Sequence, residues 1–229
     1  MKFTFILFFI LFVTPVWSGL LIDDFNDGDF NGWSPHNCTP GMQCGEWSVN
    51  NGVLHYMGSA QRTICYLTIG EDNWTDYTVT CKARMLQELR PGSFSRIMLG
   101  IHMQSEPGTN HIYYVFGPSL GAVTVGIGVL NGGGNENWAF ADIEMGRWYE
   151  LKAEVVGTDY LFYIDDELVV SHKINMLPSG KIGLGCCGAE IEFDDVIIMG
   201  DNIPDLDSNL SVDSDKILSS LWSKIKHLE

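Results

Sequence analysis

The chain has 229 residues, of which 29 are acidic and 13 basic, and its formal net charge is −16. Phosphate binding needs clustered Lys and Arg, so this charge argues against nucleic acids and anionic membranes as partners. Hydrophobic residues make up 45% of the chain, which is enough to fill the core of one domain.

The first eighteen residues have the pattern of a secretory signal peptide. Lys2 precedes an apolar run from Phe3 to Val13, and a small-residue site ending at Ser18 precedes Gly19. The run has roughly half of the ~20 residues that a membrane-spanning helix needs. We therefore expect a leader at 1–18 that is removed, no transmembrane segment in the mature chain, and a secreted protein in the periplasm or outside the cell.

Residues 19–200 show the two-residue period of half-buried strands. Leu151, Ala153 and Val155, for example, alternate with Lys152 and Glu154. Gly, Pro, Asn or Asp occurs in almost every gap, and the region has no helical period. The pattern predicts an all-β domain in which two antiparallel sheets pack face to face. The expected strands are 21–25, 47–57, 63–69, 76–86, 96–104, 111–116, 122–130, 138–143, 148–156, 160–164, 167–173 and 181–199, the last with a break near Gly188.

The end of the chain has a different pattern. Residues 201–213 lose the alternation and are expected to be a linker, and 214–229 are expected to form an amphipathic helical tail, because apolar residues recur over 214–228 at a 3.6-residue period. A helix of this length is marginal alone in water. Its apolar stripe should dock on its own domain, on a partner protein or on a membrane surface.

Six cysteines in an exported chain indicate disulfides. Cys38 and Cys44 flank a Pro-Gly turn, and a local bridge between them is the first expectation. The alternation points Cys81 and Cys186 inward, where they could meet, and Cys187 outward. Free buried thiols remain an alternative. Zinc is less favoured because no CxxC pair occurs.

Five segments carry a resemblance to known domains. They are DDFNDGDFNGW (23–33), WSVNNGVLHY (47–56), WTDYTVTCKARM (74–85), RWYELKAEVVGTDYLFYIDDELV (147–169) and KIGLG…FDDVIIM (within 181–199). Together they resemble the concanavalin-A-like jelly rolls, specifically the laminin-G-like domains and the secreted 3-keto-disaccharide hydrolase domains. The resemblance implies a jelly roll. Each segment is a strand-and-turn pattern, and none is a catalytic signature.

A glycine-rich loop, LNGGGNENW at 130–138, is the first candidate binding site. It ends in Asn135, Glu136, Asn137 and Trp138, whose amides, carboxylate and indole suit the hydroxyls and the apolar face of a sugar. The alternative is a hairpin loop whose Trp packs back on the sheet.

A sheet face offers a second set of candidate residues. By strand parity, Arg96 and His102 should face away from the core, and with Tyr114 they could line a groove. A solvated sheet face without a ligand is the alternative. Trp47 and Trp148 each open a strand, and we expect both to be core anchors and not sugar platforms.

Acidic residues lie at both ends of the domain. Asp23-Asp24 and Asp194-Asp195 belong to the first and last strands, where many carbohydrate-binding jelly rolls hold a structural calcium ion. Calcium prefers six to eight oxygen ligands. Asp24 and Asp195 are therefore the candidate metal ligands, and two acidic strand ends without a metal are the alternative. No cofactor is expected to be required.

Catalytic patterns are missing from the sequence. Glucanases of this fold carry ExDxxE on one strand, and the nearest string, Glu190 to Ile197, does not match it because Ile197 stands where the second glutamate should be. No GxSxG occurs either. We therefore expect a secreted, non-catalytic carbohydrate-binding or adhesion-type module. The alternatives are an enzyme of the 3-keto-disaccharide hydrolase type and a protein-interaction domain that uses its C-terminal helix.

Overall fold

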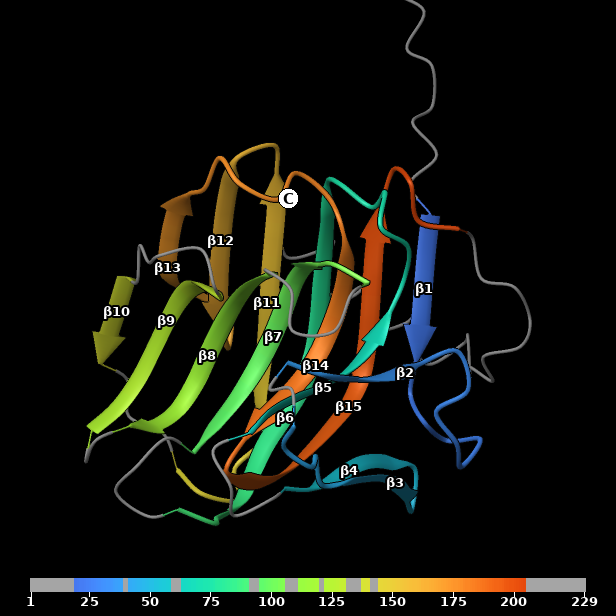
Figure 1. Ribbon diagram of the computed structural model, residues 1–229, viewed down its shortest axis with the longest axis vertical. Helices are drawn as coiled ribbons and strands as arrows, with labels where there is room; N and C mark the ends of the chain where they lie inside the picture. Colours follow the sequence, from blue (N-terminus) through green and yellow to red (C-terminus); the bar gives the residue numbers. More distant parts are fainter. Residues whose placement is uncertain are drawn as a thin grey trace, which may run out of the picture.

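The computed structural model describes residues 19–38, 41–58, 63–90, 95–105, 111–119, 122–130, 137–140 and 144–204. They form two antiparallel sheets that pack face to face, which confirms the predicted all-β sandwich (Figure 1). The predicted signal peptide, the helical tail and most of the linker lie outside the described residues. Within them, no helix is long and apolar enough to cross a membrane.

The two sheets, A and B, differ in their strands. Sheet A has the order β13-β12-β11-β6-β15-β4-β3, with β1 also paired to β15, and sheet B has the order β10-β9-β8-β7-β14-β5-β2. The strands are β1 (Gly19–Asp23), β2 (Ser34–Asn37), β3 (Glu46–Asn50), β4 (Val53–Met57), β5 (Ile64–Ile69), β6 (Tyr77–Glu88), β7 (Arg96–Met103), β8 (His111–Ser119), β9 (Ala122–Leu130), β10 (Asn137–Phe140), β11 (Tyr149–Val156), β12 (Asp159–Ile164), β13 (Glu167–Lys173), β14 (Lys181–Cys187) and β15 (Ala189–Gly200).

Turn residues explain where the strands begin and end. The expected long strand at 47–57 is a hairpin, β3 and β4, because Asn51 and Gly52 adopt left-handed φ values of 54° and 75° between them. The break expected near Gly188 is confirmed, since its φ of 62° separates β14 from β15. The short strand β2 was not predicted.

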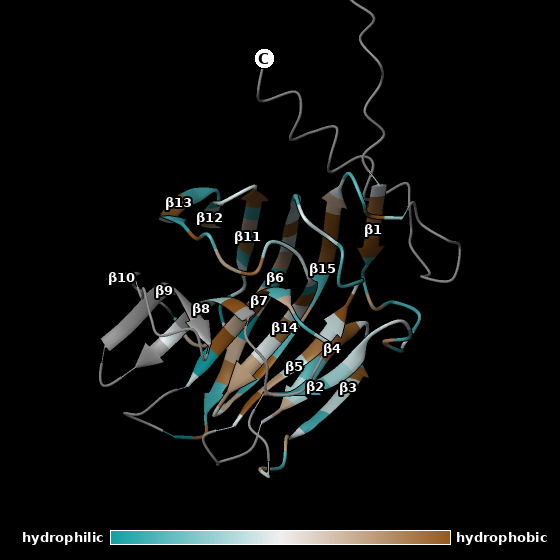
Figure 2. Cartoon of the chain, turned by 45° about the horizontal axis from the view of Figure 1, so that its top comes forward, coloured by the Kyte–Doolittle hydropathy of each residue, from teal (hydrophilic) through white to brown (hydrophobic). Residues whose placement is uncertain are grey.

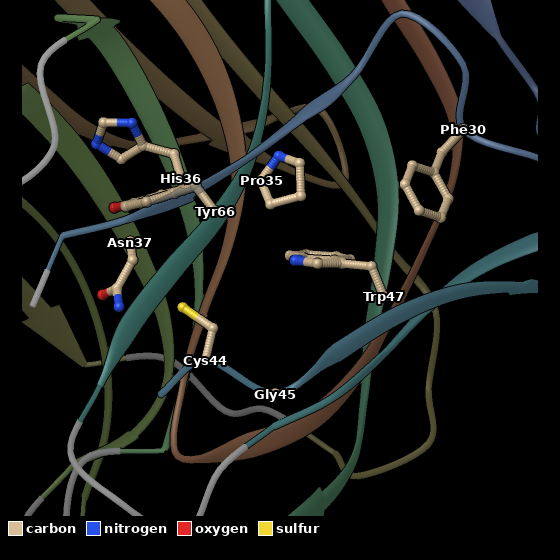
Figure 3. A pocket seen from close by; sticks show the side chains of 8 residues that line it. All are labelled: Phe30, Pro35, His36, Asn37, Cys44, Gly45, Trp47 and Tyr66. Atoms are coloured by element: carbon tan, nitrogen blue, oxygen red, sulfur yellow. The ribbon is translucent and has the colours of Figure 1, made fainter. Parts of the chain in front are cut away.

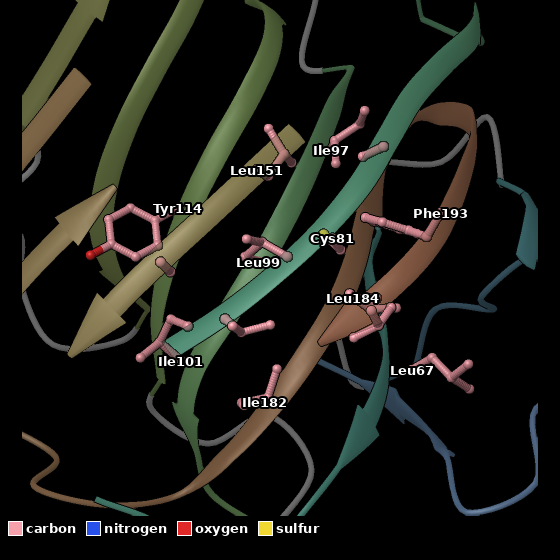
Figure 4. Close-up of a cluster of buried hydrophobic side chains, with 14 of the residues drawn as sticks. Leu67, Cys81, Ile97, Leu99, Ile101, Tyr114, Leu151, Ile182, Leu184 and Phe193 are labelled. Carbon is pink, nitrogen blue, oxygen red and sulfur yellow. The ribbon is translucent and has the colours of Figure 1, made fainter. Parts of the chain in front are cut away.

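Figure 2 shows hydrophobic and hydrophilic residues in bands along the strands, and the apolar residues of each alternation fill the space between the sheets (Figure 4). Leu151, Ala153 and Val155 are at most 1% exposed, as the alternation in β11 predicts. Across the sandwich, Tyr114 of β8 stacks on Phe162 of β12, with ring centroids 4.5 Å apart and planes 14° from parallel. Each such side chain contributes about 1.5–3 kcal/mol when it is removed from water.

A bulge in β7 reverses the expected orientation of His102. The register between β14 and β7 shifts between Lys181 and Gly183, and His102 has a φ of 50°. Its ring is fully buried, with Nε2 2.8 Å from the Thr75 carbonyl oxygen, and Tyr77 Oη accepts its backbone N–H. The prediction that His102 faces away from the core is therefore wrong, because the extra residue of the bulge changes the parity.

The disulfide also differs from the expectation. The bond joins Cys44 to Cys65, and Cys38 is a buried free thiol. The predicted Cys38–Cys44 bridge is wrong, because β2 pairs with β5 and so brings the 41–45 loop over Cys65. Cys81 and Cys186 are both buried in the core as free thiols.

Candidate functional site

A cleft of about 290 Å³ lies where the edge strand of sheet B, β2, approaches the edge strand of sheet A, β3 (Figure 3). Three strands, β2, β3 and β5, and the loops before β2 and β3 contribute aromatic, imidazole, amide and backbone groups to its wall. The lining residues are Phe30, Pro35, His36, Asn37, Cys44, Gly45, Trp47 and Tyr66.

A buried carboxylate shapes the loop that brings Phe30 and β2 to the cleft. Asp23 is 4% exposed, and its Oδ1 accepts the Phe25 N–H at 2.9 Å while its Oδ2 accepts Trp33 Nε1–H at 2.8 Å. Burial raises the pKa of Asp23 to about 6, although both hydrogen bonds oppose that shift. One carboxylate thus joins the end of β1 to the start of β2.

The opposite wall depends on the disulfide and on Tyr56. The Cys44–Cys65 bond ties the loop before β3 to β5, and Tyr56 Oη accepts the Gly45 N–H at 2.8 Å. The ring of Trp47 lies 4.4 Å from that of Tyr56. Trp47 is half-buried, so it packs on the core and still lines the cleft. The expectation of a core anchor is therefore confirmed only in part, because Trp47 packs on the core but stays half-buried.

Two polar side chains of β2 complete the cleft. Asn37 Nδ2 donates to the Met42 carbonyl oxygen at 2.6 Å, which orients its amide. His36 is half-buried, and burial, followed by the nearby Lys181, lowers its pKa, so the imidazole is neutral at pH 7. Within the part of the chain that the structure describes, no hydrogen bond involves the His36 ring. A neutral imidazole offers one donor and one acceptor, and no described residue is bonded to either.

The residues predicted to line a groove do not meet in one. His102 and Tyr114 are fully buried between the sheets, and Arg96 is half-buried at the start of β7. Asn137 and Trp138 begin β10, where Trp138 pairs with Gly126 of β9. This strand is at the opposite edge of sheet B from the cleft.

Asn135 and Glu136 lie outside the described residues. Sequence reasoning also missed the cleft. The segment HNCTPGMQCGEW at 36–47 contains most of its residues, but their composition resembles that of an ordinary loop, and only the fold brings Phe30 and Tyr66 beside them.

The acidic strand ends do come together. β1 pairs with β15, with Asp23 opposite Val196. Burial, followed by the neighbouring Asp195, raises the pKa of Asp194 to about 6, and Asp195 forms an ion pair with Lys82. Among the described residues, no group of three or more metal-ligating side chains is present. Calcium binding by Asp24 and Asp195 stays a prediction, which melting temperatures measured with calcium and with a chelator would check.

The outer face of sheet A carries a row of paired charges. Glu192 Oε2 accepts Arg84 Nε–H at 2.5 Å, and His55 Nε2 lies 2.9 Å from Glu190 Oε1. Trp148 is half-buried on this face, with the Arg84 guanidinium 4.5 Å from its ring centroid. The expectation of a core anchor is wrong for Trp148, because Tyr149 is the residue that points into the core.

The comparisons with known proteins agree with this architecture. The sequence pattern of the 3-keto-alpha-glucoside-1,2-lyase-like domain matches residues 21–199, which is the whole sandwich. The chain belongs to this family. No curated protein matches the chain in sequence.

Solved structures show how widely the family's fold is shared. A galectin-like protein of unknown function from Bacillus subtilis has a TM-score of 0.64 and 13% identity, over 80% of this chain and 96% of that one. The carbohydrate-binding module CBM66 from the same organism has a TM-score of 0.54 and 17% identity, over 73% and 95%. A Bacillus licheniformis β-glucanase has a TM-score of 0.54 and 10% identity, over 80% and 97%. The chain therefore has the concanavalin-A-like jelly roll that carbohydrate-binding modules share with glycosidases.

Proposed function

We propose that this member of the family is a secreted carbohydrate-binding module without catalytic activity. The observation that carries the proposal is the cleft between β2 and β3, which combines Trp47 and Phe30 with the imidazole of His36 and the amide of Asn37. Aromatic rings cover the apolar face of a sugar, and polar groups pair with hydroxyls that would otherwise lose water without compensation.

The carboxylates support binding over hydrolysis. A retaining glycosidase needs two carboxyl groups about 5 Å apart, one of them free to attack the sugar. On β15, Glu192 is bound by Arg84 and Glu190 by His55, so both are engaged by their own sheet. The strand also lacks the second glutamate of ExDxxE, because Ile197 occupies that position.

An enzyme of the 3-keto-disaccharide hydrolase type is the second candidate function. Family membership favours it, because the match covers residues 21–199 and therefore the complete sandwich. The raised pKa of Asp194 also provides a carboxyl group suited to acid catalysis near neutral pH. Interaction with a protein partner through 214–228 stays a prediction, since that segment lies outside the described residues.

One experiment separates binding from catalysis. Purified protein is incubated with glycans that it retains on an array, and with the 3-keto derivatives of glucosides, and products are followed by reducing-sugar release and mass spectrometry. The proposal predicts retention without a new product. Turnover of either kind of glycan would establish the enzyme instead, and a protein that retains no glycan and releases no product would exclude both functions.

A further inference from the structure

We infer that the cleft between β2 and β3 takes a single uncharged sugar residue at the end of a glycan. The inference rests on the proposed function and adds the chemical class and length of the ligand. It comes from three features: the uncharged wall of the cleft, its volume, and an imidazole to which no described residue is bonded.

The wall of the cleft carries no full charge. None of the described residues that line it is Asp, Glu, Lys or Arg, although the chain as a whole has a net charge of −16. Proteins bind the carboxylate or sulfate groups of acidic sugars through Arg or Lys, with Arg offering two parallel hydrogen bonds. Such a group would lose its water here without an Arg or Lys in the wall to replace it, and the net charge of −16 on the chain disfavours the approach of an anion.

The histidine in the cleft matches hydroxyl groups. Because burial lowers the pKa of His36, its ring is neutral at pH 7 and presents one N–H donor and one nitrogen acceptor. A sugar hydroxyl both donates and accepts, so it can satisfy either nitrogen. Lys181 is the charged group that acts on His36, and its effect on the ring is smaller than that of burial.

The size of the cleft limits the length of the ligand. Small-molecule sites usually have volumes of about 300–1,000 Å³, and this cleft, at about 290 Å³, is at the lower end. The loop that Cys44–Cys65 ties to β5 forms one wall, and the edge strand β2 forms another. One sugar ring on Trp47 fills such a space, and further residues of the glycan would extend into solvent.

The test begins with a glycan array that contains neutral glycans and glycans bearing uronic acid or sulfate. Isothermal titration calorimetry at pH 7 then follows the best neutral glycan as fragments of one to four residues that share its terminal sugar. We expect hits among neutral glycans, and affinities that change less than about threefold with length. His36→Ala should weaken binding at least tenfold. His55→Ala, a matched histidine on sheet A, should bind like the native protein.

Three other kinds of result would contradict the inference, and they differ in what they leave of the proposed function. Hits that require uronate or sulfate, or affinity that rises tenfold or more with each added residue, would contradict it while leaving carbohydrate binding in place. Native affinity in a folded His36→Ala variant would show that the glycan does not bind in the cleft. If the native protein retains no glycan, the proposed function fails together with the inference.

Discussion

The outer face of sheet A and the cleft between β2 and β3 differ in how their polar side chains are paired. On sheet A, side chains of opposite charge satisfy one another: Arg84 with Glu192, and Lys82 with Asp195. In the cleft, the polar groups are uncharged, and His36 makes no hydrogen bond within the described part of the chain. Both regions also hold a half-buried tryptophan.

The difference lies in whether the polar groups beside each tryptophan are already paired. Trp148 lies under the guanidinium of Arg84, whose Nε–H is already bonded to Glu192. Trp47 packs on the core and against the ring of Tyr56, and it also lines the cleft. Polar groups that are already paired stabilise the sheet, whereas the His36 ring, which no described residue bonds, can pair with a ligand in the concave, aromatic cleft.

The largest effect is expected from the disulfide, which ties the loop before β3 to β5 beside the cleft. Replacing Cys44 and Cys65 together by Ala should reduce the free energy of unfolding by about 3 kcal/mol, because the bond closes a loop with a sequence separation of 21. Glycan binding should weaken too, since Cys44 and Gly45 line the cleft. Urea denaturation and calorimetry measure the two effects. Unchanged stability would show that the loop is held by other contacts.

Asp194 differs from the paired carboxylates of sheet A, because Lys82 forms its ion pair with the neighbouring Asp195. Its pKa is raised from 3.8 to about 6 by burial and then by Asp195, so its ionised form costs stability above pH 6. As the pH falls from 6 towards 4, the folded state takes up the proton and this cost disappears.

Asp194→Asn should therefore increase the free energy of unfolding by about 1.5 kcal/mol at pH 7, a value reduced for the half-exposed side chain, and by almost nothing at pH 4. The amide oxygen can still accept the Asp195 N–H, which Asp194 Oδ1 accepts at 2.8 Å. Urea denaturation at the two pH values measures the difference. A stabilisation of equal size at both pH values would show that the charge is not the cause.

The smallest effect concerns the Arg84–Glu192 pair. In a double-mutant cycle of Arg84→Met and Glu192→Gln, we expect a coupling energy of about 1 kcal/mol, because the two side chains are 30% and 15% exposed. Binding of the same glycan should not change in any member of the cycle. A variant that keeps its stability but loses binding would show that the glycan binds on the outer face of sheet A and not in the cleft.

The alternation of the strands could be predicted from the sequence because it reflects local burial. Leu151, Ala153 and Val155 are buried as their period indicates, and the boundaries at 167–173 match those of β13. The orientation of His102 could not be predicted in this way, since one bulge residue in β7 reverses the parity after it.

The candidate site was harder to predict than the fold. Cys65 and Tyr66 in β5 meet the 36–47 segment only through the pairing of β2 with β5, and β2 itself has no clear alternation. Long-range pairing, and not the local pattern, therefore creates the disulfide and the cleft. Trp138 has suitable chemistry for a sugar, but its strand lies at the far edge of sheet B.

The most direct measurement of the central claim compares Trp47→Ala with Trp148→Ala. Both replace a half-buried tryptophan, one in the cleft and one on the paired face of sheet A. The glycan is one that the native protein retains, circular dichroism confirms that each variant is folded, and calorimetry measures its affinity. We predict that Trp47→Ala weakens binding at least tenfold, which is about 1.4 kcal/mol, and that Trp148→Ala binds like the native protein. Equal binding by both variants, or a loss in Trp148→Ala alone, would contradict the account.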